Sequence, residues 1–106
     1  MFADMKSMVT KAWREHYALL AINCMNLESA RAAVRVAEKH RAPIILNLYQ
    51  GHLAHFPPPV AVAVVKALAD EATVPVTLAL DHGKDPVRIR QAFRAGFSGL
   101  MIDASA

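Results

Sequence analysis

The hydrophobic residues of this 106-residue chain form two kinds of pattern, short continuous runs and stripes at helical spacing. A continuous apolar run occupies residues 18–22, and largely apolar runs occupy 44–48, 76–80 and 99–102; such runs are typical of strands buried on both faces. The segments between them repeat apolar residues at i, i+3, i+4 and i+7, the spacing of one helix face. The pattern therefore predicts four strands, each preceded by a helix.

Each predicted helix has recognisable end signals. A side chain that can accept a hydrogen bond precedes three of the helices, and a proline stands at the first position of the third and fourth. The first helix is expected to end near His16, and Gly96 is placed to end the fourth. The expected starts are Asp4, Asn26, the last proline of Pro57-Pro58-Pro59, and Asp85 followed by Pro86.

The apolar stripes predict which helix faces point inward. We expect Trp13 and Tyr17 to pack the first helix onto the lower rim of the fold. The four predicted inner faces are Met5, Met8, Val9 and Ala12; Ala30, Ala33, Val34 and Ala37; Val60, Ala63, Val64, Ala67 and Leu68; and Ile89, Ala92 and Phe93.

Regular alternation of helix and strand implies an α/β fold with parallel strands and right-handed crossovers. Four such units are half of a TIM (β/α)8 barrel, which typically needs about 250 residues. Nothing in the sequence after Asp103 would cover the strand at 99–102, and a free edge is a template for pairing. We therefore expect residues 1–106 to be a single partial domain, the N-terminal half of a barrel in a longer protein.

Composition narrows the class of protein. The chain is 55% hydrophobic and 20% charged, which favours a folded core, and no apolar run reaches the ~20 residues of a membrane span. No secretory signal is visible, and a single cysteine, Cys24, excludes an intrachain disulfide and fits the reducing cytoplasm. The net charge of +3 is spread along predicted helix faces, which argues against nucleic-acid binding.

Polar side chains follow every predicted strand, although the strands themselves are almost wholly apolar. Because parallel strands end at the same edge, these side chains are expected to emerge on one face, where catalytic groups of such folds lie. They are Asn23, Tyr49 with Gln50, Asp81 with His82, and Asp103 with Ser105.

Asp81 and His82 are the leading candidates for chemistry. Neighbours in an extended segment point in opposite directions, which suits His82 as a metal ligand and Asp81 as a proton donor or acceptor. The alternative is a simple turn, in which Asp81 caps a loop amide and Gly83 supplies a positive φ. Spacing alone leaves both interpretations open, since a catalytic zinc usually has three protein ligands.

Several motifs resemble one family over essentially the whole chain. Leu80-Asp81-His82-Gly83, then 95–98 (Ala-Gly-Phe-Ser) and 101–105 (Met-Ile-Asp-Ala-Ser), resemble the class II, metal-dependent ketose-bisphosphate aldolases, the fructose- and tagatose-bisphosphate aldolase group. Residues 21–23, 26–28 and 42–45 look like the first strand, first helix start and second strand of that family.

The resemblance implies a (β/α)8 barrel and a divalent metal, usually zinc. It implies reversible cleavage of a ketose (bis)phosphate to dihydroxyacetone phosphate and an aldehyde, in a cytoplasmic homo-oligomeric lyase of glycolysis or related carbohydrate metabolism. The metal would act as a Lewis acid that polarises the ketone and stabilises the enediolate. By the same resemblance, His82 and Asp103 would be metal ligands, Asp81 the acid/base at the C4 hydroxyl, and Asn23 a residue of the substrate pocket.

The chain departs from the family at two places. Tyr49-Gln50-Gly51-His52 replaces a small serine-containing turn, so Tyr49 and Gln50 are expected at the substrate with a changed preference. The other metal histidines and the phosphate-binding loops of the family lie beyond this sequence, so little activity is expected from these residues alone. Two alternatives remain: a metal-dependent barrel enzyme acting on a non-phosphorylated sugar or related carbonyl compound, and a non-catalytic half-barrel that associates with itself.

Three other residues are weaker candidates. His52 and His55 could bind a metal or a substrate, but a solvent-exposed loop pair is the favoured interpretation. Cys24 follows a strand without a basic cluster around it, and a buried small residue is expected there.

Overall fold

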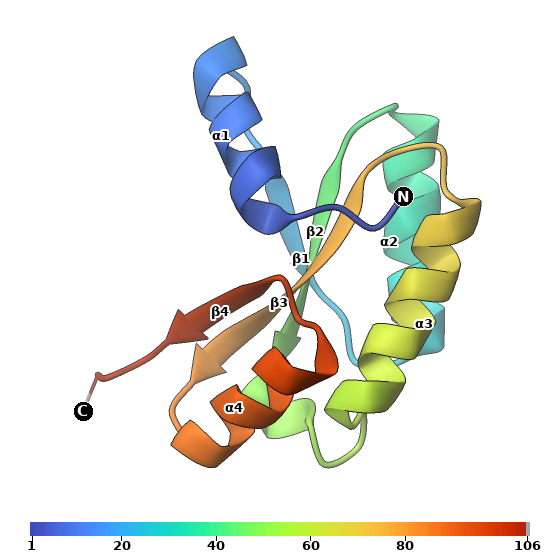
Figure 1. The fold of residues 1–106 in the computed structure, drawn as a ribbon. Coiled ribbons are helices and arrows are strands. Elements are labelled where there is room, and N and C mark those ends of the chain that lie inside the picture. Colours follow the sequence, from blue (N-terminus) through green and yellow to red (C-terminus); the bar gives the residue numbers. More distant parts are fainter. Residues whose placement is uncertain (106) are drawn as a thin grey trace.

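A computed structural model describes residues 1–105 of the chain. Its four strands form one parallel sheet in the order β1-β2-β3-β4, and helices alternate with them as predicted (Figure 1). No helix within residues 1–105 is long and apolar enough to cross a membrane. The elements are α1 (Met5–Glu15), β1 (Leu20–Asn23), α2 (Leu27–Lys39), β2 (Ile44–Tyr49), the 3₁₀ turn η1 (Gln50–His52), α3 (Pro58–Glu71), β3 (Val76–Gly83), α4 (Pro86–Ala95) and β4 (Gly99–Ile102).

The helix ends follow the local sequence signals. The side chains of Asp4, Asn26 and Asp85 each accept a 2.9 Å hydrogen bond from a backbone amide in the first turn of their helices. Gly96 ends α4 in the left-handed region at φ 111°. One boundary differs from the prediction: α3 begins at Pro58, because Pro57 already serves as the residue before the helix.

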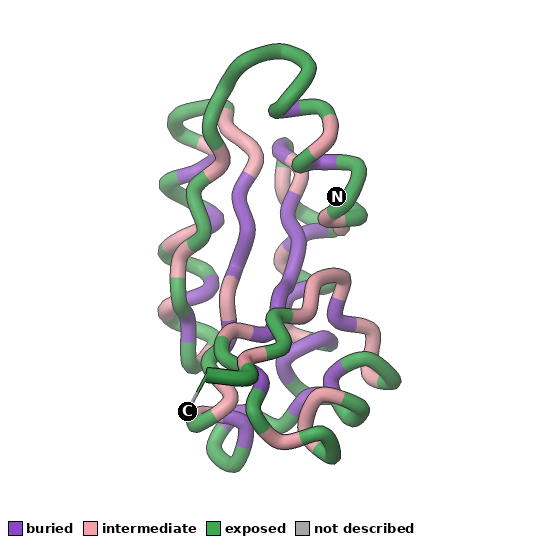
Figure 2. Tube along the Cα trace, turned by 90° about the vertical axis from the view of Figure 1, so that its left-hand side faces the viewer, coloured by how far each residue is buried: buried purple, intermediate pink, exposed green. Residues whose placement is uncertain are grey.

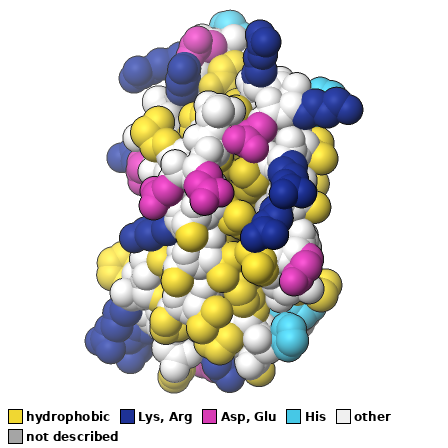
Figure 3. All heavy atoms as spheres, turned by 90° about the vertical axis from the view of Figure 1, so that its right-hand side faces the viewer, with side chains coloured by type: hydrophobic (Ala, Val, Ile, Leu, Met, Phe, Trp, Pro, Cys, Tyr) yellow, Lys and Arg dark blue, Asp and Glu magenta, His cyan; other side chains and the backbone are white. Residues whose placement is uncertain are grey.

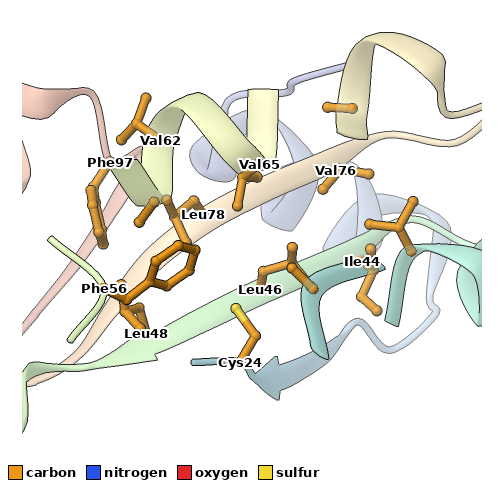
Figure 4. Close-up of a cluster of buried hydrophobic side chains, with 14 of the residues drawn as sticks. Cys24, Ile44, Leu46, Leu48, Phe56, Val62, Val65, Val76, Leu78 and Phe97 are labelled. Atoms are coloured by element: carbon orange, nitrogen blue, oxygen red, sulfur yellow. The ribbon is translucent and has the colours of Figure 1, made fainter. Parts of the chain in front are cut away.

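The main core lies between the sheet and helices α2, α3 and α4. Leu46, Leu48 and Leu78 point from the two central strands toward Val62 and Val65 of α3, and all five are buried (Figure 4). Each such side chain contributes roughly 1.5–3 kcal/mol through removal from water. Buried residues concentrate in the middle of the molecule, along the central strands and the inward helix faces (Figure 2).

Strand β1 is not buried on both faces, contrary to the prediction for residues 18–22. Leu20 is 63% exposed, and Ile22 is only half-buried. The reason is its position: within the described residues β1 is an edge strand that pairs only with β2. A continuous apolar run indicates a strand, but its burial depends on how many neighbours the strand has.

The buried face of α3 also differs from the prediction. Val62, Val65 and Ala69 face the core, whereas Val60 is 49% exposed and Ala63 lies on the outer surface. Hydrophobic side chains are visible across this outer face (Figure 3). Val64 and Leu68 of the predicted stripe are half-buried and pack against the core, so the prediction is correct in part. Since α3 is apolar on nearly every side, its periodicity fits more than one inward face, and the helix is rotated from the predicted face toward Val62, Val65 and Ala69.

Helix α1 contacts the opposite face of the sheet through its N-terminal part. Met8 packs with Ile45 and Ala79 in a second, smaller cluster, as the stripe predicted. Trp13, however, is 82% exposed, so its predicted packing on the lower rim is wrong. This helix reaches the sheet only through its first turns, and its second half extends away from the strands (Figure 1). Tyr17, which follows α1, is exposed as well, and so are three helix residues that were predicted to face inward, Val9, Ala67 and Phe93.

Candidate functional site

The predicted strand-end residues gather at the carboxyl edge of the sheet. Asn23 of β1 pairs with Asn47 of β2, and Tyr49 at the end of β2 pairs with Asp81 of β3, so β2 lies in register between β1 and β3. The Nδ2 atom of Asn23 donates a 3.0 Å hydrogen bond to Oδ2 of Asp81. The arrangement therefore joins the first and third strands above the end of the second.

His82 turns the end of β3. Its φ of 52° lies in the left-handed region, which is uncommon for a residue with a side chain and is found at functional sites. As a result its Nε2 atom is 3.8 Å from Oδ1 of Asp81, so the two side chains converge. The expected opposite orientation, based on extended geometry, is wrong at this position.

Gly83 does not supply the positive φ that the turn interpretation predicted. It is required for a different reason, because a Cβ there would lie 2.8 Å from the carbonyl oxygen of Met101 and 2.8 Å from Cγ1 of Ile89. The close approach of β4 and α4 to the end of β3 therefore depends on this glycine.

Asp103 holds the imidazole of His82. Its Oδ2 is 2.9 Å from Nδ1 of His82, and its Oδ1 accepts hydrogen bonds from the hydroxyl and amide of Ser105, at 2.6 and 2.9 Å. The Ser105 hydroxyl, then the His82 imidazole and the Ser105 amide hold the pKa of Asp103 well below its usual range. A carboxylate on Nδ1 favours the tautomer in which Nε2 carries a free lone pair.

Lys84 completes the charge pattern beside this pair. Its Nζ is 3.9 Å from Oδ2 of Asp103, an exposed ion pair of modest strength. Sequence reasoning missed Lys84. Its position immediately after Gly83, in the loop that leaves the candidate strand, is the signal that could have identified it.

Gln50 links two loops at the edge. Its Oε1 accepts hydrogen bonds from the backbone amides of Lys84 and Asp85, at 2.7 and 2.8 Å. These bonds fasten η1 to the start of α4. The role of Gln50 in substrate binding stays a prediction.

Tyr49 stands between two imidazoles. Its ring packs edge-on against His52, with 5.5 Å between ring centroids, and edge-on against His82 at 6.2 Å. His52 is half-buried and His55 is exposed, so they do not form an equivalent pair. Tyr49 is itself partly exposed, and it forms one side of the space around His82.

The donor set fits part of a metal site. His82 offers Nε2 as one ligand, with Asp103 in the orienting position that such histidines commonly have. Among residues 1–105 no group of three histidine, cysteine or acidic side chains is placed to hold a metal ion.

Cys24 is 2% exposed, and burial raises the pKa of its thiol to about 11, which confirms the expected buried small residue.

Solved structures share this fold. The YdjI aldolase from Escherichia coli K12 superposes with a TM-score of 0.87 and 30% sequence identity, over 99% of this chain and 41% of that one. An aldolase structure from Coccidioides immitis, described as a putative fructose-1,6-biphosphate aldolase, gives a TM-score of 0.80 at 31% identity, covering 91% of this chain and 38% of that one. The four strands therefore correspond to the N-terminal part of a class II aldolase TIM barrel, which confirms the predicted fold class.

Sequence relatives point the same way. The chain is 39% identical to a 6-phospho-5-dehydro-2-deoxy-D-gluconate aldolase of Bacillus licheniformis, and 39% identical to a fructose-bisphosphate aldolase of Mycoplasma pneumoniae. The alignments cover 98% and 99% of this chain, but the chain spans only 37% of the length of each relative. Residues 3–106 match the family described as fructose-bisphosphate aldolase class-II. The chain therefore belongs to the class II fructose-bisphosphate aldolase family.

Proposed function

We propose that this chain supplies the N-terminal section of an aldolase catalytic centre that uses a divalent metal, preferably zinc, to cleave a ketose phosphate reversibly to dihydroxyacetone phosphate and an aldehyde. The observation that carries the proposal is the pair of contacts Asn23–Asp81 and His82–Asp103 at one strand edge. The carboxyl edge is where barrel enzymes of this architecture hold their catalytic groups.

Asp81 is the proposed acid/base. Its carboxylate accepts a hydrogen bond from Asn23 through Oδ2. The other oxygen, Oδ1, is free to accept the proton of a substrate hydroxyl during cleavage and to return it during condensation. Asn23 would fix the plane of the carboxylate and, with Tyr49 and Gln50, border the substrate.

His82 is the proposed metal ligand, through Nε2. Its side chain is 53% exposed at the edge of the sheet, and its Nδ1 contact with Asp103 would fix the ring direction. Asp103 itself was predicted as a ligand; we assign it the orienting role in this arrangement, because both of its oxygens already accept hydrogen bonds. When bound, the metal would supply Lewis-acid polarisation of the substrate carbonyl.

Completion of the site requires further strands. One imidazole does not make a closed catalytic zinc site, and relatives of this chain are far longer. The 106-residue chain alone is therefore expected to show little or no cleavage activity.

The direct test joins this chain to the C-terminal part of the Mycoplasma pneumoniae relative, starting after its matched region. Cleavage of fructose bisphosphate and of 6-phospho-5-dehydro-2-deoxy-D-gluconate is then measured with and without chelator, with an Asp81→Asn chimera as the matched control. We expect activity that chelator abolishes and zinc restores. Activity indifferent to chelator, or a folded, zinc-loaded chimera that cleaves no ketose phosphate, would overturn the proposal.

A second substrate class is supported by Tyr49. Its ring occupies space beside His82, 6.2 Å between centroids, at a strand end expected to contact the substrate. A bulky phenol there favours a non-phosphorylated ketose or related carbonyl compound. A panel that compares each ketose with its phosphate ester separates the two classes.

A further inference from the structure

A groove lies on the outer surface, between the loop that joins β2 to α3 and the helix α4. One side is formed by Leu53, Ala54 and the three prolines 57–59. The other side is formed by Arg88, Gln91 and Arg94 of α4. We call this feature the arginine groove. Its volume of about 540 Å³ falls within the range of small-molecule sites, about 300–1,000 Å³.

The charge of the arginine groove is uncompensated. No acidic side chain lines it, and neither Arg88 nor Arg94 forms an ion pair within residues 1–105. The carboxylate of Asp85, which is close by in sequence, accepts the amide of Val87 as a helix cap. Two positive charges therefore face the groove without a partner of opposite sign.

Another charged hollow on the surface is different. The hollow between α2 and α3 contains Arg31 and Arg35, but Glu38 and Glu71 line it too. The charges that line this second hollow are of both signs, although no ion pair joins them within residues 1–105. The charges that line the arginine groove are all positive, which makes it the more complementary of the two to an anion.

The walls of the groove are preformed. Proline has a fixed φ, so residues 57–59 form a stiff apolar wall, and Pro58 is buried at the first position of α3. Arg88 is half-buried, which places its apolar stem along the groove. Arg88 and Gln91 are three residues apart on α4 and share one helix face. A ligand would find both an apolar wall and cationic donors already in place.

We propose that the arginine groove binds a small organic anion, with a phosphate or carboxylate head on Arg88 and Arg94 and an apolar body against the prolines. Guanidinium groups match both heads through paired, charge-assisted hydrogen bonds. None of Asn23, Asp81, His82 and Asp103 lines this groove, so the site is separate from the candidate catalytic edge and does not depend on the proposed aldolase activity.

The test is a titration of the 106-residue chain, labelled with ¹⁵N, with phenyl phosphate and with benzoate, and benzyl alcohol serves as the neutral analogue. We expect amide shifts confined to residues 53–56, before the three prolines, and to residues 88–95 with one or both anions. Preference for phenyl phosphate or for benzoate identifies the natural head group. Binding that is equally strong with benzyl alcohol, or shifts centred on another surface, would overturn the proposal.

Variants sharpen the test. Arg88→Gln and Arg94→Gln should each raise Kd about tenfold, since each removes one charge-assisted contact. Arg90→Gln, on the same helix but outside the groove, is the matched control and should leave Kd within twofold. Ala54→Glu places a negative charge in the groove and should abolish binding. Equal effects of the Arg90 and Arg88 changes, with both chains folded by circular dichroism, would contradict the assignment.

Discussion

Asn23 donates a 3.0 Å hydrogen bond to Asp81, although β2 lies between the two strands that carry these residues. The contact joins positions 58 residues apart in sequence. It occupies one oxygen of the carboxylate and leaves the other facing His82. The orientation of the proposed acid/base is therefore set by a strand that is not its neighbour in the sheet.

Substitutions at this contact should separate chemistry from positioning. In the barrel completed as described above, Asp81→Asn should lower kcat by about 10²–10⁴-fold, because the amide cannot take up a proton. Asn23→Ala should lower kcat by a smaller factor and leave metal content unchanged. Steady-state kinetics with metal analysis checks both. Loss of metal from the Asn23→Ala protein would contradict a role limited to orienting Asp81.

The contact between Asp103 and His82 should control metal affinity. Asp103→Asn preserves the size of the side chain but weakens its hydrogen bond to Nδ1 of His82. The zinc affinity of the completed barrel should therefore fall about 10–100-fold. Competition with a chromogenic chelator measures the change. Asp70→Asn, on the distant helix α3, serves as the control. Unaltered affinity in the Asp103→Asn protein would remove Asp103 from the site.

Two valines of α3 test which face of this helix is buried. Val65→Ala, at a fully buried position, should lower the free energy of unfolding by about 1.5–3 kcal/mol. Val60→Ala should change it by no more than about 0.5 kcal/mol, because Val60 lies on the outer surface. Urea denaturation measures both values, and the change in helix propensity is the same in each. A larger loss of unfolding free energy in the Val60→Ala protein than in the Val65→Ala protein would support the inward face that the sequence pattern predicted.

Cys24 should report global unfolding. Its thiol is 2% exposed and has a pKa raised to about 11 by burial, so little reactive thiolate exists at pH 8. Iodoacetamide should modify the native protein slowly and the urea-unfolded protein at the rate of a free cysteine. Mass spectrometry follows the reaction. Rapid labelling of the native protein at low reagent concentration would contradict the buried position.

Asp4 should contribute to acid sensitivity. The Ser7 amide, followed by the Ser7 hydroxyl, lowers the pKa of Asp4 in the folded chain. A carboxyl with a lowered folded pKa stabilises the protein above its unfolded pKa, near 3.9, and this contribution is lost as pH falls through the folded pKa. Asp4→Asn preserves the cap without the charge. Its stability should therefore decline less than that of the parent chain between about pH 5 and 3, as measured by urea unfolding.

The sequence predicted features that depend on neighbouring residues. Strand positions, the caps at Asp4, Asn26 and Asp85, and the glycine stop at Gly96 are local signals, and the structure confirms them. The parallel order followed from regular alternation of helix and strand. At the candidate site, the parallel arrangement predicts that Asn23 and Asp81 lie at one edge, and the structure has them in hydrogen-bond contact there.

Other features depend on tertiary context. The exposure of β1 follows from its having a single partner strand, which an apolar run does not reveal. The inward face of α3 depends on how the helix is rotated against the sheet. The convergence of Asp81 and His82 results from the left-handed backbone of His82, and the requirement for Gly83 results from the nearness of β4. The hydrogen bonds that Gln50 accepts from the amides of Lys84 and Asp85 join two loops far apart in sequence, and no local pattern predicts such a contact.

The exposed edge strand β1 has a consequence for hydrogen exchange. Its four residues pair only with β2 in the described chain, whereas β2 and β3 are held on both sides. Amide protons of β1 should therefore exchange through local fraying, at a smaller free-energy cost than those of the central strands. Each fraying event releases Asn23 from Asp81 while the core stays folded. In the 106-residue chain, the orientation of Asp81 by Asn23 therefore depends on the local stability of one four-residue strand rather than on global stability.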